Sequence, residues 1–290
     1  MSIASIQSKY PSAIWYDSNH GGTNSGTLDN PYTSLDTAMT NASSGGVIAI
    51  LDGTHSEDVQ ITISKVLTLV GESTNAILST SGSSYGGAIV ASNSGGLKLE
   101  TLKLFHNNSS AQYGLIRMGI SNTTYDLTIE GCILEMGSAT LSATDLRGWI
   151  MGGSTPEATL DISGSVILGG SSASGNGILV GATGTGDGFD VINITASTIV
   201  VNGGSGTKLS IYSTGITSSI FKNNIFVGNG NSETIGFTPS TYLNNCHYNN
   251  GETTGGTDNL FSTDPQFVDS TTGDYRLRPA SPCIGAGTAS

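Results

Sequence analysis

Large apolar residues recur along the chain in pairs whose two members are five positions apart. The first members of successive pairs are separated by 30, 33, 32, 26 and 23 residues, and no helical pattern fills the intervals. A period of about 20 to 35 residues built from short strands is typical of a solenoid. We therefore expect coils stacked about 4.8 Å apart that bury their aliphatic side chains against one another. The pairs are Leu99/Leu104, Ile129/Leu134, Ile162/Ile167, Ile194/Ile199, Ile220/Ile225 and Leu243/Tyr248.

A second apolar series lies between these pairs, so each repeat carries two or three short strands separated by Gly, Ser, Thr and Asn. Glycine accounts for 41 of the 290 residues, about twice its ordinary share. This suits a chain that turns sharply several times in each coil. The expected fold is all-β, a single-stranded parallel β-helix. The second series comprises Ile89, Ile116, Ile150, Ile178, Ile211 and Ile235.

One domain is expected over residues 1–290, because the repeat crosses every candidate boundary. Residues 1–46 are expected to form an irregular lead-in that ends in a capping helix. Residues 47–263 then form the coils. Over residues 264–290 the period stops, and three prolines indicate an extended tail that caps the last coil.

The capping helix is expected to begin near Thr33, because Thr33 and Asp36 together resemble a capping box. Its apolar residues fall on one helical face, and an open solenoid end needs such a lid over its core and strand edges. That face carries Leu35, Ala38, Met39 and Ala42.

The first strands are expected at Val47–Leu51, Val59–Ile63 and Val66–Val70.

The chain is acidic, with a net charge of −12 and only ten Lys and Arg residues. Such a surface repels phosphate backbones and anionic headgroups, so neither nucleic acid nor a membrane is expected as a partner. The longest apolar runs fall far short of the roughly 20 residues of a membrane helix. Residues 1–15 lack the features of a secretion signal, so export is expected by another route or after removal of a signal.

The three cysteines, Cys132, Cys246 and Cys283, show no CxxC or metal-ligand spacing. Cys132 and Cys246 each follow the first aliphatic residue of their repeat by three positions, but four coils separate them. Stacking then places them about 19 Å apart, too far for a disulfide. All three are expected to be small buried residues in the ladders.

Motifs at both ends of the chain are those of a known family. They are Trp15-Tyr16-Asp17, Asn30-Pro31-Tyr32, Gly53-Thr54-His55, Asp264-Pro265-Gln266-Phe267, Gly273-Asp274-Tyr275 and Ser281-Pro282-Cys283-Ile284-Gly285. Together with the repeats, they resemble right-handed parallel β-helix proteins of the pectate-lyase-like superfamily. The resemblance implies a right-handed solenoid but no particular activity, since the same coil carries lyases, hydrolases, adhesins and bacteriophage tailspikes. Gly285 stands where related closing segments usually carry an acidic residue.

Glu100 and Glu130 are the leading candidate for a site, because each follows the first aliphatic residue of its repeat by one position. On adjacent coils their carboxylates should point outward about 5 Å apart. Such a pair can bind calcium or act as the acid and nucleophile of a retaining glycosidase, with Lys103 and Arg117 beside it. The simpler interpretation is two solvated glutamates compensated by Lys98 or Lys103. No catalytic residue is assigned, and no cofactor is expected unless calcium binds here.

Tyr113 and Trp149 are a second binding candidate, since they flank the strands at 116 and 150 and an exposed ring can stack on a sugar. Asp187 and Asp190 come nearest to the aspartate cluster of polygalacturonase-like sites, but their setting resembles a turn. The histidines lie on different coils or in the lead-in, and none has a partner at metal-ligand spacing. They are His20, His55, His106 and His247.

Two functions remain open. One is a non-catalytic structural or binding protein, displayed on a bacteriophage virion as a decoration, fibre or spike, or on a cell surface. It would contact a surface glycan, neighbouring proteins or copies of itself. The other is a polysaccharide lyase or glycoside hydrolase of the same fold. The scarcity of basic residues and the lack of an assembled acid and base favour the first. An exterior composition without a secretion signal favours the virion surface over another extracellular location.

Overall fold

The structure is a computed structural model. It describes residues 1–57, 61–81, 88–91, 96–106, 115–118, 126–137, 150–151, 158–169, 178–181, 188–201, 210–211, 215–228, 234–235, 237–251 and 255–288.

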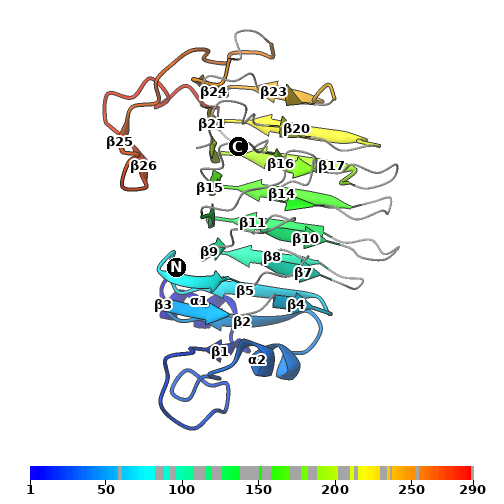
Figure 1. The fold of residues 1–290 in the computed structure, drawn as a ribbon, viewed down its shortest axis with the longest axis vertical. Coiled ribbons are helices and arrows are strands. Elements are labelled where there is room, and N and C mark those ends of the chain that lie inside the picture. Colours follow the sequence, from blue (N-terminus) through cyan, green and yellow to red (C-terminus); the bar gives the residue numbers. More distant parts are fainter. Residues whose placement is uncertain are drawn as a thin grey trace.

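Three parallel sheets contain 24 of the 26 strands found in the described residues, and in each sheet a strand pairs with its equivalents in the coils before and after it (Figure 1). This all-parallel order of sequential neighbours is compatible with a parallel β-helix. Sheet A contains β1 (Ile14–Tyr16), β2 (Gly46–Ile50), β5 (Leu67–Gly71), β8 (Leu97–Glu100), β11 (Asp126–Glu130), β14 (Thr159–Ser163), β17 (Val191–Thr195), β20 (Ser218–Lys222) and β23 (Thr241–Leu243).

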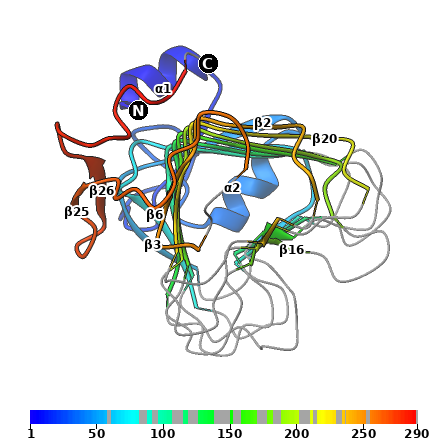
Figure 2. The ribbon, with the colours of Figure 1, turned by 90° about the horizontal axis from the view of Figure 1, so that it is seen from above.

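Sheet B contains β3 (Gly53–Glu57), β6 (Ala76–Thr80), β9 (Lys103–His106), β12 (Ile133–Met136), β15 (Val166–Gly169), β18 (Thr198–Val201), β21 (Ile225–Val227) and β24 (Cys246–Tyr248). Sheet C contains β4 (Ile61–Ile63), β7 (Ile89–Ala91), β10 (Ile116–Met118), β13 (Ile150–Met151), β16 (Ile178–Gly181), β19 (Ser210–Ile211) and β22 (Thr234–Ile235). The end-on view shows the three sheets as separate faces of the stack (Figure 2).

The expected inward column is confirmed in the middle of the stack. Ile129, Ile162 and Ile194 lie directly opposite one another on β11, β14 and β17, and all three are buried. Alternation along each strand sends the intervening residues outward. The aliphatic ladder therefore forms the core, as the repeat predicts.

The register differs by one residue in the last coils, and here the expected pairs are wrong. Ile194 faces Phe221 and not Ile220, and Ile199 faces Phe226. Two apolar residues stand side by side at each position, so periodicity alone could not choose between them. Burying the phenyl ring removes more apolar area from water, and a slip of one residue reverses the two faces. The observed pairs are Phe221/Phe226 and Tyr242/His247, in place of Ile220/Ile225 and Leu243/Tyr248.

Sheet C follows the second expected series except at one strand. Ile116 faces both Ile89 and Ile150 as predicted, but Ile150 faces Val180 and not Ile178. Ile211 also faces Val180, and the pairing of β16 with β19 contains a register shift between Ile178 and Val180.

A ladder of hydrogen bonds from backbone N–H groups to side-chain oxygens runs along the short turns between sheets A and B. In each turn the first residue is left-handed, for example at Gly131 and Asn223. The side chain of the second residue accepts from a backbone N–H in the coil before it. The members of this turn ladder are Cys132, Ser165, Ser197, Asn224, Asn245 and Asn259.

The turn ladder corrects the expected positions of the cysteines. Cys132 belongs to it, but its equivalent at the C-terminal end is Asn245, whereas Cys246 starts β24 opposite Ile225. Both residues are buried, as expected, but Cys283 is only partly buried and lies in the tail rather than in a ladder.

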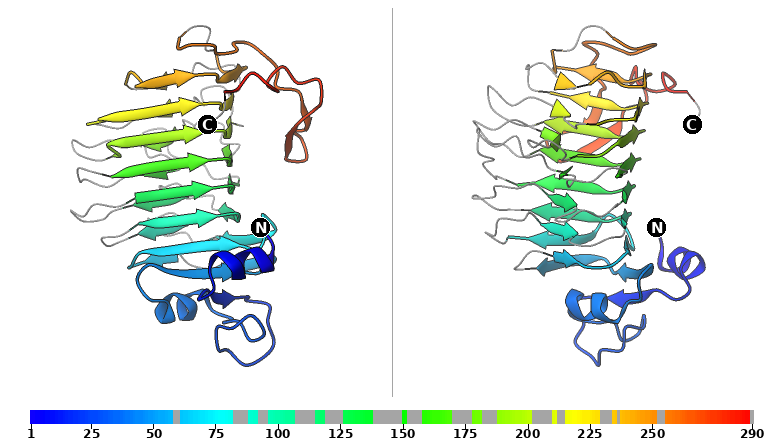
Figure 3. Two further views of the ribbon diagram at one scale, coloured as in Figure 1. Left: turned by 180° about the vertical axis from the view of Figure 1, so that it is seen from behind. Right: turned by 90° about the vertical axis from the view of Figure 1, so that its right-hand side faces the viewer.

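Two helices cover the N-terminal end. The expected capping helix is α2 (Leu35–Asn41), which buries Leu35, Ala38 and Met39 in the core, and its N-cap is Ser34 rather than Thr33. The lead-in is not irregular as predicted, because it also forms β1 and a second helix, α1 (Ile3–Lys9). Figure 3 shows both helices at this end of the stack.

The C-terminal tail forms a hairpin where an extended segment was expected. Strands β25 (Phe267–Asp269) and β26 (Asp274–Leu277) pair antiparallel and stand beside sheet B (Figures 1 and 2). The chain then returns to the turn ladder, where Asn244 Nδ2 donates to the carbonyl of Ala286 at 3.0 Å. We call residues 264–288 the arm. None of the helices in the described segments is long and apolar enough to cross a membrane.

Candidate functional site

Glu100 and Glu130 lie opposite each other on β8 and β11, as the repeat predicts. They belong to an outward column of sheet A that begins with Trp15, Ala49 and Val70. Helix α1 packs on the apolar part of this column through Ile6 and reaches Glu100 at its end. The two carboxylates therefore differ in exposure: Glu100 is 2 % exposed and Glu130 is 49 % exposed.

Three donors occupy the Glu100 carboxylate. Lys9 Nζ lies 2.5 Å from Oε1, and Oε2 accepts from the Tyr10 hydroxyl at 2.7 Å and from Lys98 Nζ at 3.1 Å. Lys98 also reaches Glu130 at 2.7 Å. Burial opposes ionisation of Glu100, but these hydrogen bonds outweigh it and hold the pKa of the carboxyl below its usual range. In this arrangement Glu100 anchors α1 to sheet A, and Lys98 joins Glu100 to Glu130.

The two cations expected beside this pair lie elsewhere. Lys103 pairs with Glu135 at 2.6 Å and lies over the ring of Phe105, on the outer face of sheet B. Arg117 belongs to β10 of sheet C, in register with Val90. Neither residue contributes to a constellation with the glutamates.

Three other predicted residues, Tyr113, Trp149 and Asp187, lie outside the described residues, and the interpretation of each stays a prediction. Asp190 is described, and its Oδ2 accepts a hydrogen bond from the backbone N–H of Ala158 at 3.2 Å. This bond ties neighbouring coils together where the chain enters sheet A.

Two histidines close the ends of one inward column of sheet B. His55 begins the column, and its Nδ1 accepts from the backbone N–H of Ser18 at 3.1 Å. His247 ends the column, stacked between Phe226 and Phe261 at centroid distances of 5.3 and 5.1 Å. These buried imidazoles therefore have a structural role, since they cover the two ends of the column.

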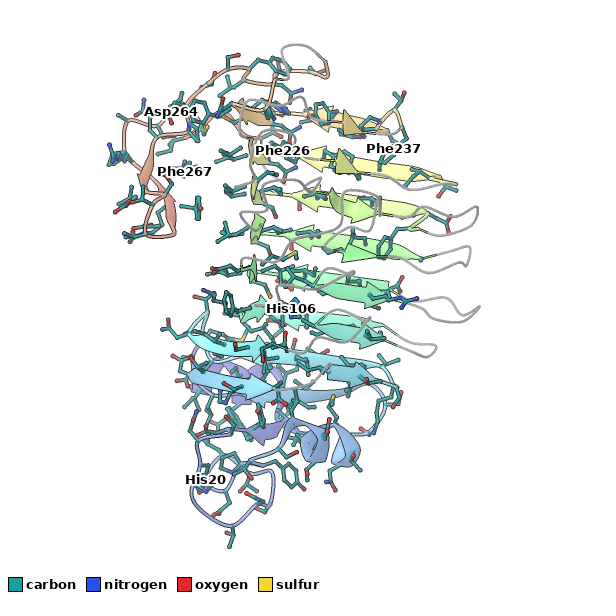
Figure 4. All side chains as sticks on the ribbon, viewed as in Figure 1. His20, His106, Phe226, Phe237, Asp264 and Phe267 are labelled. Carbon is teal, nitrogen blue, oxygen red and sulfur yellow. The ribbon has the colours of Figure 1, made fainter. Side chains whose placement is uncertain are left out.

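The other two histidines lie apart from these. His106 bonds to the Thr80 hydroxyl at 2.7 Å, and burial lowers its pKa. His20 lies in the N-terminal loop (Figure 4). Across the described ranges, no group of three or more His, Cys, Asp or Glu side chains is placed to hold a metal ion.

The feature that the sequence did not reveal is a groove of about 610 Å³ between the arm and the outer face of sheet B. We call it the arm groove. Asp264 lies at the root of the arm and Phe267 on its hairpin (Figure 4). The lining residues are Val200, Val227, Tyr248, Asp264, Gln266, Phe267, Ser270, Thr271, Tyr275 and Arg278.

Stacked coils build the first wall of the arm groove. Val200, Val227 and Tyr248 lie opposite one another on β18, β21 and β24, on the outward face of sheet B. Tyr248 was expected inside the core, but the shifted register turns it outward, and it is 36 % exposed. The wall is therefore an apolar stripe that ends in an accessible phenol ring.

The hairpin builds the second wall. The rings of Phe267 and Tyr275 meet edge to face, with centroids 5.1 Å apart. Antiparallel pairing of Phe267 with Leu277 holds them together. The two walls thus present aromatic surface to one cavity.

Polar groups surround these walls and are held by the arm's own backbone. Asp264 Oδ1 accepts from the N–H of Gln266 at 2.8 Å, and Arg278 Nη2 donates to the carbonyl of Val268 at 2.9 Å. Gln266, Ser270 and Thr271 add further hydrogen-bonding groups. Aromatic walls with a few fixed polar groups are the usual composition of a small-molecule site.

One sequence signal could have predicted the hairpin. Phe267-Val268-Asp269 and Asp274-Tyr275-Arg276 are separated by Ser-Thr-Thr-Gly, which is a typical turn between alternating segments. The groove itself could not be predicted, because it depends on where the hairpin lies against sheet B. No protein-family model matches the chain, and no curated protein matches it either. Inference about function therefore depends on the residues and their geometry.

Proposed function

We propose that this chain is a right-handed parallel β-helix protein of the pectate-lyase-like superfamily that acts by binding rather than catalysis. Its ligand is a surface glycan held in the arm groove. Its setting is the outside of a bacteriophage virion, as a decoration, fibre or spike, or a cell surface. Neighbouring surface proteins or copies of the chain contact the remaining outer faces.

The arm groove carries this proposal. Its volume of about 610 Å³ lies within the range of ordinary ligand sites. A sugar ring offers apolar C–H faces to aromatic rings and hydroxyl groups to polar side chains. Tyr248 and Tyr275 come from opposite walls, while Asp264 and Arg278 supply an acceptor and a donor.

The same lining favours binding over hydrolysis. Among the described residues that line the arm groove, Asp264 is the only carboxylate. A glycosidase needs two carboxyl groups that flank the scissile bond, and a lyase needs a positioned base. Glu100 and Glu130 lie on sheet A, and the chain's own lysines already bind them.

A glycan array tests the proposal directly. We expect the protein to retain a subset of surface glycans, and Tyr248→Ala to weaken that binding at least about tenfold because a stacking contact is lost. The matched control is Val268→Ala, which alters the same arm at a side chain that does not line the groove and should leave binding unchanged.

Two results would refute the proposal. One is glycan binding that survives both Tyr248→Ala and Tyr275→Ala. The other is turnover of uronic-acid or neutral polysaccharides, read as unsaturated products or new reducing ends, that is abolished by Glu100→Gln or Arg117→Ala. The second result would establish the lyase or hydrolase alternative.

A further inference from the structure

Two cysteines, one in the last coil and one in the arm, line a hollow on the side of the arm away from the arm groove. A second hollow of about 370 Å³ separates the arm from the turn ladder, and Cys246 and Cys283 both line it. Cys246 begins β24 in the last full coil, and Cys283 lies in the returning tail. Each thiol shifts the pKa of the other, and this mutual effect, together with their shared place in the hollow, puts the two side chains close to each other.

The surrounding bonds hold both thiols in this position. Cys246 Sγ lies 3.4 Å from the carbonyl oxygen of Thr263, where the arm begins. The backbone N–H of Cys283 donates to Ser281 Oγ at 3.2 Å, and Ser281 Oγ donates to the carbonyl of Pro265 at 2.6 Å. The two ends of the hairpin are therefore bonded to each other near the two cysteines.

The two thiols are chemically unequal. The neighbouring Cys246 side chain lowers the pKa of Cys283, with the Ser281 hydroxyl acting in the same direction. The Cys283 side chain, together with burial, raises the pKa of Cys246. Cys283 is also the more exposed of the two. An accessible thiol that ionises more readily, beside a buried partner, matches an attacking and a resolving cysteine.

We propose that Cys246 and Cys283 form a disulfide in oxidising surroundings and so lock the arm onto the last coil. With glutathione disulfide as the oxidant, the Cys283 thiolate attacks one of its sulfurs and releases one glutathione thiolate. Cys246 then gives its proton to that thiolate and attacks the Cys283 sulfur. This step releases the second glutathione as a thiolate, which takes up the proton that Cys283 lost.

The bond would fix one wall of the arm groove. The groove-lining residues of the arm, from Asp264 to Arg278, all lie between the two cysteines in the sequence. Closing this segment removes conformations in which the hairpin swings away from sheet B. A ligand site on the hairpin would then be preorganised. Exterior proteins are the ones in which such bonds persist.

Peptide mapping tests the disulfide. The folded protein is incubated with glutathione disulfide, denatured in N-ethylmaleimide and digested without reductant. We expect a peptide pair linked through Cys246 and Cys283, about two mass units lighter than the two free peptides together. Cys132 should be alkylated, since it lies four coils away. The matched control Cys132→Ser should form the same link.

Three results would overturn the inference: alkylation of both Cys246 and Cys283 after oxidation, glutathione that remains on Cys283, or Cys283 linked between two chains. A second readout is the rate at which N-ethylmaleimide labels Cys246 in the folded, reduced protein. Cys283→Ser should leave Cys246 slow to react, because Cys246 is buried. Because thiols are read directly, the outcome stands whether or not the groove binds a glycan.

Discussion

Different elements lie at the two ends of the stack. At the N-terminal end, α2 lies on the core and α1 covers the outer face of sheet A, so that Ile6, Trp15 and Val70 form a buried apolar cluster. At the C-terminal end, the arm stands beside sheet B and leaves a hollow on each side. A solenoid end must be covered because it exposes core and strand edges. Helices form a seal here, whereas the hairpin leaves room for a ligand.

The largest expected effect tests whether the C-terminal coils are packed as firmly as the rest. Phe221→Asp should lower the free energy of unfolding by more than about 4 kcal/mol, because a lone charge would be buried in the core column. Urea denaturation measures the loss. The neighbouring Ile220→Asp is the matched control and should cost much less, since Ile220 is only partly buried. Equal losses would show that the shifted register is wrong.

The turn ladder is expected to contribute next. Asn224 accepts from the N–H of Ser197 and donates to the carbonyl of Ile194 and to Asn245 Oδ1. Asn224→Ala should lower the free energy of unfolding by about 2 to 4 kcal/mol, because its buried partners lose their hydrogen bonds. The exposed Asn41→Ala in α2 should cost less than about 0.5 kcal/mol. A loss at Asn224 no greater than that at Asn41 would contradict the ladder.

A smaller effect is expected at the N-terminal seal. Glu100→Gln should lower the free energy of unfolding by about 1 to 3 kcal/mol. This range is kept low because Lys9 is 45 % exposed and solvent screens its ion pair with Glu100. The folded state lowers the pKa of Glu100, so its contribution is complete above the unfolded-state pKa near 4.5 and is lost as the pH falls through the folded-state pKa. The difference between wild type and variant should therefore shrink below about pH 4.5. Glu130→Gln, on the exposed partner, should cost less and serves as the control.

The smallest expected effect concerns calcium. Chelation should leave the melting temperature unchanged beyond ionic-strength effects, because the lysines already satisfy the glutamate pair. A ligand that binds only the folded state stabilises it, so a calcium-dependent shift that disappears in Glu130→Gln would overturn this expectation.

The sequence predicted the features that follow from the repeat. It did not predict those that depend on where an element packs against the rest of the molecule. The column through Ile162 and the register of Glu100 with Glu130 follow from regular spacing. The repeat did not predict the register where two apolar residues are adjacent, as at Ile220 and Phe221. There the packing volume decides which residue turns inward. The burial of Glu100 depends on α1, which lies 91 residues earlier in the chain at Lys9.

Hydrogen–deuterium exchange, measured with and without the glycan that the array retains most strongly, tests whether the C-terminal end binds the ligand while the N-terminal end is a seal. We expect the glycan to slow exchange in peptides covering the arm and β24, around Tyr248 and Tyr275. Peptides from α1 and β1 should be protected equally in both states, because they lie at the end of the stack away from the arm groove. Slowed exchange at α1 and β8, with none at the arm, would contradict the account.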